Sequence, residues 1–279
     1  MNILNYCTLS DDGHKLTLPP KWQFTLDKDE YRDFKQSLLN VKAVWVGNQQ
    51  FEFPYNAKNV IERMAAGDNI DFRKLQLFPT PIDLADYMWE CLIYELGFTF
   101  YPNIKVLEPG AGTGNLIKYL ANKGIESIDY CEICPEFDYI IKAETEGIKT
   151  KKVGDDFLKS GIRGEYDLVF ANPPFSSDTK HFSKMLESVK EGGYVCTLMG
   201  DGFFEKNRSD DFEAFSKKYG FKEWFCTGTP RFDAKEKHEW IFENTPSGYS
   251  LLVVRKFYER QKPISKREKI KQQQTALFE

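Results

Sequence analysis

The pattern with the most chemical content is Asn172-Pro173-Pro174-Phe175, which closely follows a short apolar run at residues 168–170. Proline has no backbone N–H and restricts the residue before it, so the two prolines end the strand that the apolar run predicts. The stiff Pro-Pro step presents the Asn172 amide and the Pro173 carbonyl at a fixed spacing, and Phe175 follows as a flat apolar platform. A strand-ending turn with no chemistry is the alternative interpretation.

Two hydrogen-bond acceptors beside an aromatic ring suit the alkylation of an exocyclic amine. The nitrogen of such an amine is a poor nucleophile because its lone pair is delocalised. Two acceptors on its N–H bonds draw the nitrogen toward tetrahedral geometry and aim the lone pair at an electrophile, while the ring stacks on the base plane. This is catalysis by positioning and electrostatics, and it requires no strong base.

A glycine-rich turn earlier in the chain indicates a ligand site. A strand predicted at residues 104–108 ends in Glu108, and Gly110, Gly112 and Gly114 follow before a helix begins. Glycines permit a tight turn and a close approach of the backbone to a ligand. The G-x-G-x-G spacing differs from the dinucleotide fingerprint, and Glu108 repels a pyrophosphate but suits an ammonium or sulfonium group. A nicotinamide dehydrogenase is therefore disfavoured.

Two further strand ends carry acids. Glu132 ends the next predicted strand, 18 residues past Gly114, where an acid meets a pair of ribose hydroxyls, and Ile133 adjoins it in the same candidate site. After the third strand, Asp156 is placed to accept from an adenine amine while Phe157 packs on the ring. The alternative for this second pair is a helix cap and a core aromatic.

A helix that begins near Thr80 is a further candidate for ligand binding. Thr80 is a natural N-cap, Pro81 occupies the first helical position, and Asp83 completes a capping-box-like pattern in a helix predicted to run to Gly97. The plain interpretation of Thr80 is a cap. The sharper one is that this helix start lies beside a cofactor and binds its carboxylate.

These residues require a sheet that brings strand ends together. Strands alternating with helices predict an open, mostly parallel, Rossmann-like α/β sheet of seven strands, whose carboxyl edge is where ligands bind. The strands are expected at residues 104–108, 126–132, 148–153, 168–170, 193–199, 221–226 and 249–257.

The first seventy-odd residues predict a separate small α+β unit. Asp27 and Glu30 form a capping box that opens a helix, and residues 41–53 predict a hairpin. Residues 22–26 predict a short strand. Its aromatic residues, Trp22, Trp45 and Phe51, are expected to form the core of the unit rather than a stacking surface. We place the domains at residues 1–76 and 77–258, with a basic and flexible tail at residues 259–279.

Composition bounds the class of protein. The chain has 279 residues and a net charge of −4, and it has neither an 18-residue apolar run nor a secretory leader, so we expect a cytoplasmic, membrane-free protein. Its six cysteines are expected to be reduced, and we expect no metal site. Residues 255–271 carry eight basic and two acidic side chains, a net charge of +6. The rest of the chain therefore has a net charge of −10, which is unusual for a stand-alone nucleic-acid binder.

The order of the motifs resembles a known family. Phe-Pro-Thr-Pro begins at Phe78, Glu-Pro-Gly-Ala-Gly-Thr-Gly at Glu108, Asp-Phe-Leu at Asp156 and Asn-Pro-Pro-Phe at Asn172, with the strand-end acid Glu132 between them. This order resembles class I S-adenosylmethionine-dependent methyltransferases, specifically the gamma-type amino-methyltransferases of DNA adenine, over residues 78–257. With the N-terminal unit attached, the chain is similar to predicted methyltransferases of phages and mobile elements.

The resemblance implies S-adenosyl-L-methionine as the cofactor. The residues implied to hold it, from the methionine part through the ribose to the adenine, are Thr80, Glu108, Gly110, Gly112, Glu132, Ile133, Asp156 and Phe157, together with Asn172. In the catalytic motif, Asn172 and the Pro173 carbonyl would grip the target amine, beside Pro174, and Phe175 would stack on a flipped base.

The function expected from these motifs is methyl transfer to the exocyclic N6 amine of adenine in double-stranded DNA. An RNA adenine or protein-glutamine methyltransferase is the alternative among enzymes, and a non-catalytic methyltransferase-like partner subunit is the alternative outside them. Gamma-type enzymes usually carry a target-recognition domain after the core, whereas only about twenty residues follow residue 257. Target reading is therefore expected from the N-terminal unit, from the loop at residues 227–248 or from a protein partner.

Overall fold

The structure is a computed structural model, and it describes residues 2–20, 22–23, 26–72, 77–101, 103–200, 203, 221–226 and 249–256. The loop expected at residues 227–248 and the basic tail expected at residues 259–279 lie outside the described residues. No helix in the described part of the chain is long and apolar enough to cross a membrane.

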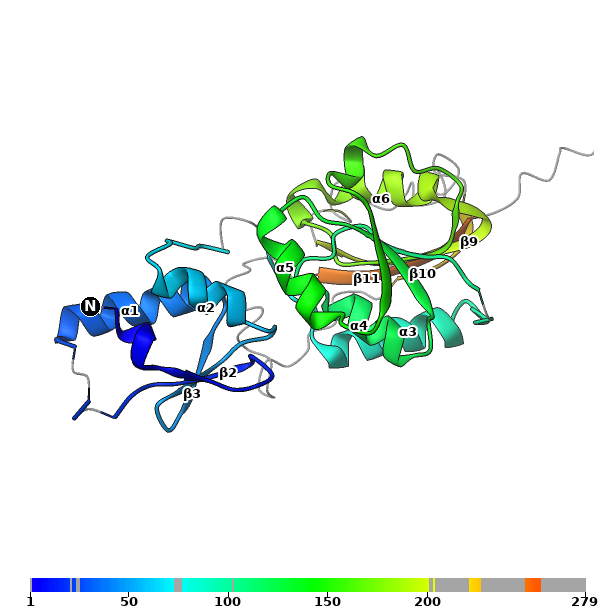
Figure 1. Cartoon of the computed structure of the whole chain (residues 1–279). Helices are drawn as coiled ribbons and strands as arrows, with labels where there is room; N and C mark the ends of the chain where they lie inside the picture. The colour runs from blue at the N-terminus through cyan, green and yellow to red at the C-terminus, as the bar shows by residue number, and fades with distance from the viewer. Residues whose placement is uncertain are drawn as a thin grey trace, which may run out of the picture.

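One large sheet organises the chain after residue 100, in the strand order β10-β11-β9-β8-β5-β6-β7 (Figure 1). The pairs from β9 to β7 are parallel, and β11 runs antiparallel to both β9 and β10. The expected mostly parallel α/β sheet is therefore confirmed. Its strands are β5 Val106–Glu108, β6 Ser127–Cys131, β7 Lys149–Gly154, β8 Tyr166–Ala171, β9 Val189–Gly200, β10 Phe221–Cys226 and β11 Tyr249–Lys256.

The strand order reverses beside β5. From β5 the chain moves outward through β6 and β7, then returns to β8 and β9 on the other side. Such a reversal opens a crevice at the carboxyl ends of the two adjacent strands. The end of β5 is Glu108, and Asn172 follows the end of β8, so the topology brings the glycine-rich turn and the Asn-Pro-Pro-Phe motif to one edge.

Helices cover both faces of the sheet because its strands alternate between two apolar clusters. Val106, Leu168 and Phe170 pack in a cluster with α3, α4 and α5, whereas Leu107 and Val169 pack in a second cluster with α6. All five strand residues are buried, as expected for a parallel sheet covered on both faces. The helices are α1 Lys28–Asn40, α2 Lys58–Ala65, α3 Ile82–Tyr94, α4 Asn115–Asn122, α5 Pro135–Glu144 and α6 Asp178–Ser188.

The N-terminal unit has its own antiparallel sheet in the order β1-β2-β4-β3, with α1 and α2 beside it (Figure 1). The predicted capping box is confirmed, because Asp27 accepts from the Glu30 amide and Glu30 accepts from the Asp27 amide. The predicted hairpin is also confirmed, with positive φ at Asn48 and Gln49 between its strands. The strands are β1 Thr8–Leu9, β2 Lys15–Thr17, β3 Val44–Gly47 and β4 Gln50–Glu52.

The strand predicted at residues 22–26 is wrong at Trp22 and Gln23, whereas residues 24–25 lie outside the described residues. The Gln23 backbone amide donates to the Pro20 carbonyl at 2.9 Å. This hydrogen bond closes a turn where a paired strand was expected. Trp22 is 85% exposed and Trp45 is 39% exposed, so only Phe51 of the three aromatic residues lies in the core. The prolines before Trp22 explain the error, because they favour a turn over a paired strand.

A buried acid on α5 joins the two units. Glu144 accepts hydrogen bonds from the His14 ring, the Lys118 ammonium and the Asn56 amide, and its side chain is 3% exposed. The hydrogen bond to Glu144 raises the pKa of His14. Burial alone would raise the pKa of Glu144, but its hydrogen bonds from His14 and Lys118 outweigh burial and lower it. The cluster is therefore charged and stabilising in mildly acidic solution.

Glu144→Gln is expected to lower the free energy of unfolding by about 1–3 kcal/mol near pH 6, because a buried charged hydrogen-bond network loses its anion. His14 contributes below its ordinary pKa, and its share is lost as the pH rises through the raised folded value. The loss should therefore be smaller at pH 9, where only the shares of Lys118 and of the Asn56 backbone amide remain.

Urea unfolding at the two pH values measures this difference. Glu52→Gln is the matched control, because Glu52 pairs with Lys15 at an exposed site, where such pairs contribute about 0–1 kcal/mol. An equal loss at pH 6 and pH 9 would contradict the assigned role of His14.

Candidate active site

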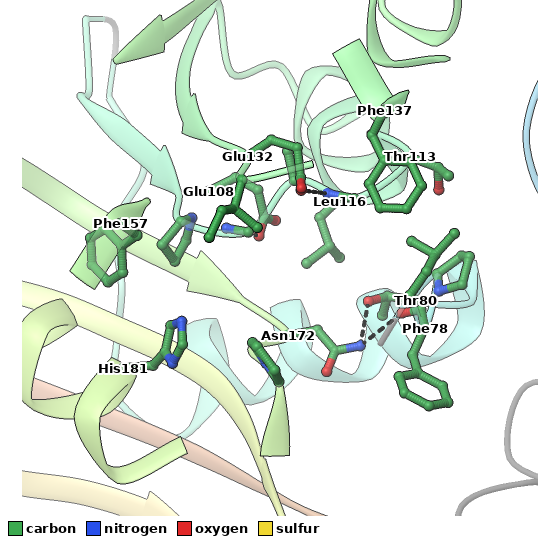
Figure 2. A pocket seen from close by; sticks show the side chains of 18 of the residues that line it. Phe78, Thr80, Glu108, Thr113, Leu116, Glu132, Phe137, Phe157, Asn172 and His181 are labelled. Atoms are coloured by element: carbon green, nitrogen blue, oxygen red, sulfur yellow. Dashed lines mark hydrogen bonds between the residues drawn. The ribbon is translucent and has the colours of Figure 1, made fainter. Parts of the chain in front are cut away.

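A cavity of about 300 Å³ opens at the carboxyl edge of the sheet. Ten of the twelve residues predicted for the site line it, and Figure 2 shows several of them facing a common space. Pro173 and Phe175 are the two that are not among its lining residues. The predicted residues that line it are Thr80, Glu108, Gly110, Gly112, Glu132, Ile133, Asp156, Phe157, Asn172 and Pro174.

The side-chain amide of Asn172 is held in one orientation. Its Nδ2 donates to the Phe78 carbonyl at 3.2 Å and to Thr80 Oγ1 at 3.1 Å (Figure 2). A backbone carbonyl can only accept, so the nitrogen must face Phe78 and the oxygen must face away. Within the described part of the chain, no group donates to Asn172 Oδ1. The side chain therefore presents a fixed acceptor beside the cavity.

Thr80 has a different local role from the predicted one. The helix α3 begins at Ile82 with Pro81 as its N-cap residue, and no side chain caps it. Thr80 lies one residue too early for its oxygen to reach the first free amides of the helix, and that oxygen accepts from Asn172 instead. The predicted cap and the capping box with Asp83 are wrong. Thr80 nevertheless lines the cavity, as the sharper interpretation expected.

Glu132 fastens the glycine-rich turn to the end of β6. One carboxylate oxygen accepts from the Gly112 amide and the other from the Cys134 amide, each at 2.7 Å. The side chain is buried, and burial raises its pKa although both amide bonds lower it. Each oxygen of a carboxylate can accept more than one hydrogen bond, so Glu132 retains acceptor capacity toward the cavity.

Glu108 is the less satisfied of the two acids. It is 1% exposed, its Oε1 is 3.4 Å from the Gly110 amide, and its Oε2 is buried with no hydrogen-bond partner among the described residues. Burial raises the pKa of Glu108 well above its ordinary value, and the nearby Glu132 raises it further. A buried acceptor without a donor is costly, and such groups mark functional sites more often than structural ones.

Two glycines fit the space around these acids. Gly112 has a φ of +53°, which glycine adopts readily, and a side chain there would meet Leu77 at 3.0 Å. Gly110 also lines the cavity, and a β-carbon built on it meets no atom within 4 Å. A larger residue at position 110 would therefore occupy free space beside the cavity.

The Asp156 and Phe157 pair shows the structural roles that were its alternative interpretation. Asp156 accepts from the Leu158 amide at 3.0 Å, as the cap of a short 3-10 turn, and pairs with Lys159, which lowers its pKa. Phe157 is 3% exposed and belongs to the core cluster on the α6 face. Both residues also line the cavity, where a bound ligand can contact them.

His181 lines the same cavity and was missed by the sequence analysis. Its ring stacks beside Phe157, with centroids 6.2 Å apart and planes inclined by 27°. Its Nδ1 lies 3.0 Å from the Ser177 carbonyl, which can only accept, so Nδ1 carries the proton and Nε2 is the acceptor nitrogen of the ring. Burial lowers the pKa of His181, so it is neutral at pH 7. A lone histidine on a helix carries no motif, so nothing in the sequence singled it out.

The arrangement can bind a ligand with a cationic part and hydroxyl groups. Glu108 offers a buried acceptor to a cation, Glu132 offers acceptors to hydroxyls, and Asn172 offers a fixed acceptor at the opposite side of the cavity (Figure 2). The fold brings these three side chains to one cavity, as the sequence predicted.

Comparison with known proteins identifies the fold. No protein-family model matches the sequence, and no curated protein matches it. The 23S rRNA methyltransferase ErmE has a TM-score of 0.50 and 18% identity, over 66% of this chain and 71% of its own. This likeness shows a shared methyltransferase fold.

Two other solved structures are similar over comparable spans. A suggested RNA methyltransferase from Pyrococcus horikoshii has a TM-score of 0.47 and 21% identity, over 66% of this chain and 88% of its own. The cyclase SpnF has a TM-score of 0.46 and 16% identity, over 63% of this chain and 80% of its own. A shared fold does not by itself fix the chemistry, so the residues of the site must decide the function.

Glu108→Gln is expected to stabilise the ligand-free protein at pH 8 by roughly 0.5–2 kcal/mol, the usual gain from relieving an unfavourable functional site. A buried carboxyl with a raised pKa costs stability at every pH above its unfolded value, and glutamine removes that cost. The gain should vanish near pH 3, well below the ordinary glutamate pKa of about 4.3, where Glu108 is protonated in both the folded and the unfolded states. Thermal unfolding at the two pH values measures it.

Glu132→Gln is the matched comparison, and the opposite sign is expected. A glutamine has only one oxygen for the two amides that Glu132 accepts, so one donor loses its partner. Stabilisation by both substitutions, or by neither, would refute the contrast between the two acids.

Proposed function

We propose that this protein transfers a methyl group from S-adenosyl-L-methionine to the exocyclic N6 amine of adenine in DNA. The observation that carries the proposal is the anchoring of Asn172. Its amide nitrogen is committed to Phe78 and Thr80, so Oδ1 faces away from them as a fixed acceptor for an amine N–H beside the cavity. The orphaned oxygen of Glu108 and the free space at Gly110 support a second ligand in the same cavity.

The residues present fit S-adenosyl-L-methionine. Its ammonium group would satisfy Glu108 Oε2, which is buried without a donor among the described residues. Its ribose hydroxyls would donate to Glu132, and its adenine would lie among Ile133, Asp156 and Phe157, which line one side of the cavity. When bound, this cofactor supplies a methyl group on a sulfonium centre, which a nitrogen nucleophile can accept. Ile133 is 67% exposed, as expected of an apolar surface that a ligand covers.

The protein itself contributes binding and orientation. Asn172 Oδ1 and the Pro173 carbonyl would accept the two N–H bonds of the target amine, which aims the nitrogen lone pair. Thr80 fixes the Asn172 rotamer through a 3.1 Å hydrogen bond, and the buried Pro173 keeps the backbone rigid. His181 Nε2 is a neutral acceptor in the same cavity. No strong base is required, since the proton leaves after the nitrogen has become cationic.

RNA adenine is the second candidate substrate. ErmE, whose fold the chain shares, is a 23S rRNA methyltransferase, and the Asn-Pro-Pro-Phe motif suits an amine on either nucleic acid. Incubation with tritiated cofactor and equal masses of DNA, RNA and protein extract separates the classes. We expect label in DNA, whereas label confined to RNA would move the substrate to the second candidate, and label in protein alone would exclude both.

Asn172→Ala is expected to reduce methyl transfer by at least about 10²-fold, by analogy with the loss of one oxyanion-hole donor, while leaving the affinity for S-adenosylhomocysteine within a few-fold. Glu132→Ala should weaken that affinity strongly, because it removes the ribose acceptors and releases the glycine-rich turn. Calorimetry with S-adenosylhomocysteine and a tritium transfer assay measure the two effects.

Asn122→Ala and Glu126→Ala are the matched controls, because both side chains are exposed on the same domain. Neither should change binding or turnover. Loss of cofactor affinity in Asn172→Ala, with normal affinity in Glu132→Ala, would reverse the assignment of the two sides of the cavity.

A further inference from the structure

The stacking role that the motif implies for Phe175 remains a prediction. Phe175 is not among the residues that line the cavity, and it is partly buried against the core. It packs over the end of β9, where a β-carbon built on Gly200 would lie 3.1 Å from the Phe175 β-carbon. A ring held against the sheet in this way serves packing.

A second aromatic ring lies beside the fixed acceptor. Phe78 is half-buried and lines the cavity, and its own carbonyl holds Asn172 Nδ2 at 3.2 Å. Figure 2 shows Phe78 and Asn172 next to each other, joined by the hydrogen bond from Asn172 Nδ2 to the Phe78 carbonyl. This bond ties the loop that carries the Phe78 ring to the amine acceptor.

The N-terminal unit supports this ring. The Lys42 ammonium lies 4.6 Å from the centroid of Phe78, within the range of a cation–π contact. Lys42 follows the end of α1 with a φ of +66°, a conformation that residues other than glycine adopt at a cost, and its amide donates to the Leu39 carbonyl at 3.1 Å. The contact therefore places the Lys42 ammonium over one face of the Phe78 ring.

We propose that Phe78, backed by Lys42, is the platform on which the target base stacks. The substrate pocket is then built across both units, with the amine acceptor just after β8 and the support for the ring just after α1. This inference rests on the proposed function and deepens it, since it assigns the N-terminal unit a part in holding the base. Stacking on one aromatic ring contributes about 5- to 150-fold in affinity per base.

The test uses the full chain, saturated with S-adenosylhomocysteine, and a fluorescein-labelled single-stranded oligo-deoxyadenylate. Phe78→Leu keeps an apolar side chain of similar size but loses the aromatic face, whereas Phe78→Trp keeps one. We expect Phe78→Leu to weaken oligonucleotide binding by at least about fivefold and Phe78→Trp to retain it. Lys42→Gln should give an intermediate loss. S-adenosylhomocysteine affinity should be unchanged in all three.

Phe175→Leu and Phe100→Leu complete the design. Phe100 is 42% exposed and contacts the turn at Gly124, so its substitution should leave oligonucleotide affinity unchanged. A larger loss in Phe175→Leu than in Phe78→Leu would overturn the inference and leave the proposed function intact. Failure of the native chain to bind S-adenosylhomocysteine would instead overturn the proposed function itself.

Discussion

The structure of the site depends on one hydrogen bond, from Asn172 Nδ2 to the Phe78 carbonyl. An amide side chain can turn either end toward a partner, but a backbone carbonyl accepts only a donor. That single constraint fixes the Asn172 oxygen as the end that faces away, and the bond from Thr80 adds a second restraint on the same nitrogen. Asn172 is followed by the stiff Pro173-Pro174 step, and its two hydrogen-bond acceptors lie in the loop before α3.

Two acids at neighbouring strand ends show how similar residues acquire different roles. Glu132 is buried and accepts hydrogen bonds from two backbone amides, so it stabilises the glycine-rich turn. Glu108 is buried with one weak partner and one orphaned oxygen, so it lowers stability unless a cation is supplied. In the proposed function, a positively charged ligand offsets this cost when it binds beside Glu108. Stability and binding therefore oppose one another at that residue.

Much of the fold followed from pattern, because apolar runs that end in acids, glycines or prolines specify buried parallel strands. The same patterns placed Glu108, Glu132 and Asn172 at one edge, and the structure brings them together. Positions that depend on three-dimensional neighbours were harder to predict. The N-cap of α3 is Pro81, one residue after the predicted Thr80, and Trp22 lies in a turn where a strand was predicted. His181 lines the cavity although it belongs to no sequence motif.

Phe78 and Phe175 illustrate the same limit in the site. Both follow the pattern of an aromatic beside a proline, and the sequence does not reveal which ring reaches the cavity. Gly200 lies against Phe175 and Lys42 lies over the Phe78 ring, and neither is near its partner in the chain. Local pattern specified the elements, whereas contacts between distant residues specified the roles.

Locating the transferred methyl group tests the central claim most directly. DNA incubated with the protein and a trideuteriomethyl-labelled cofactor would be digested to nucleosides and separated by mass spectrometry against synthetic standards. The account predicts the heavy methyl on the exocyclic N6 of deoxyadenosine and its absence when Asn172→Ala replaces the native chain. A heavy methyl on a ring carbon or ring nitrogen, or an equal yield from Asn172→Ala, would contradict it.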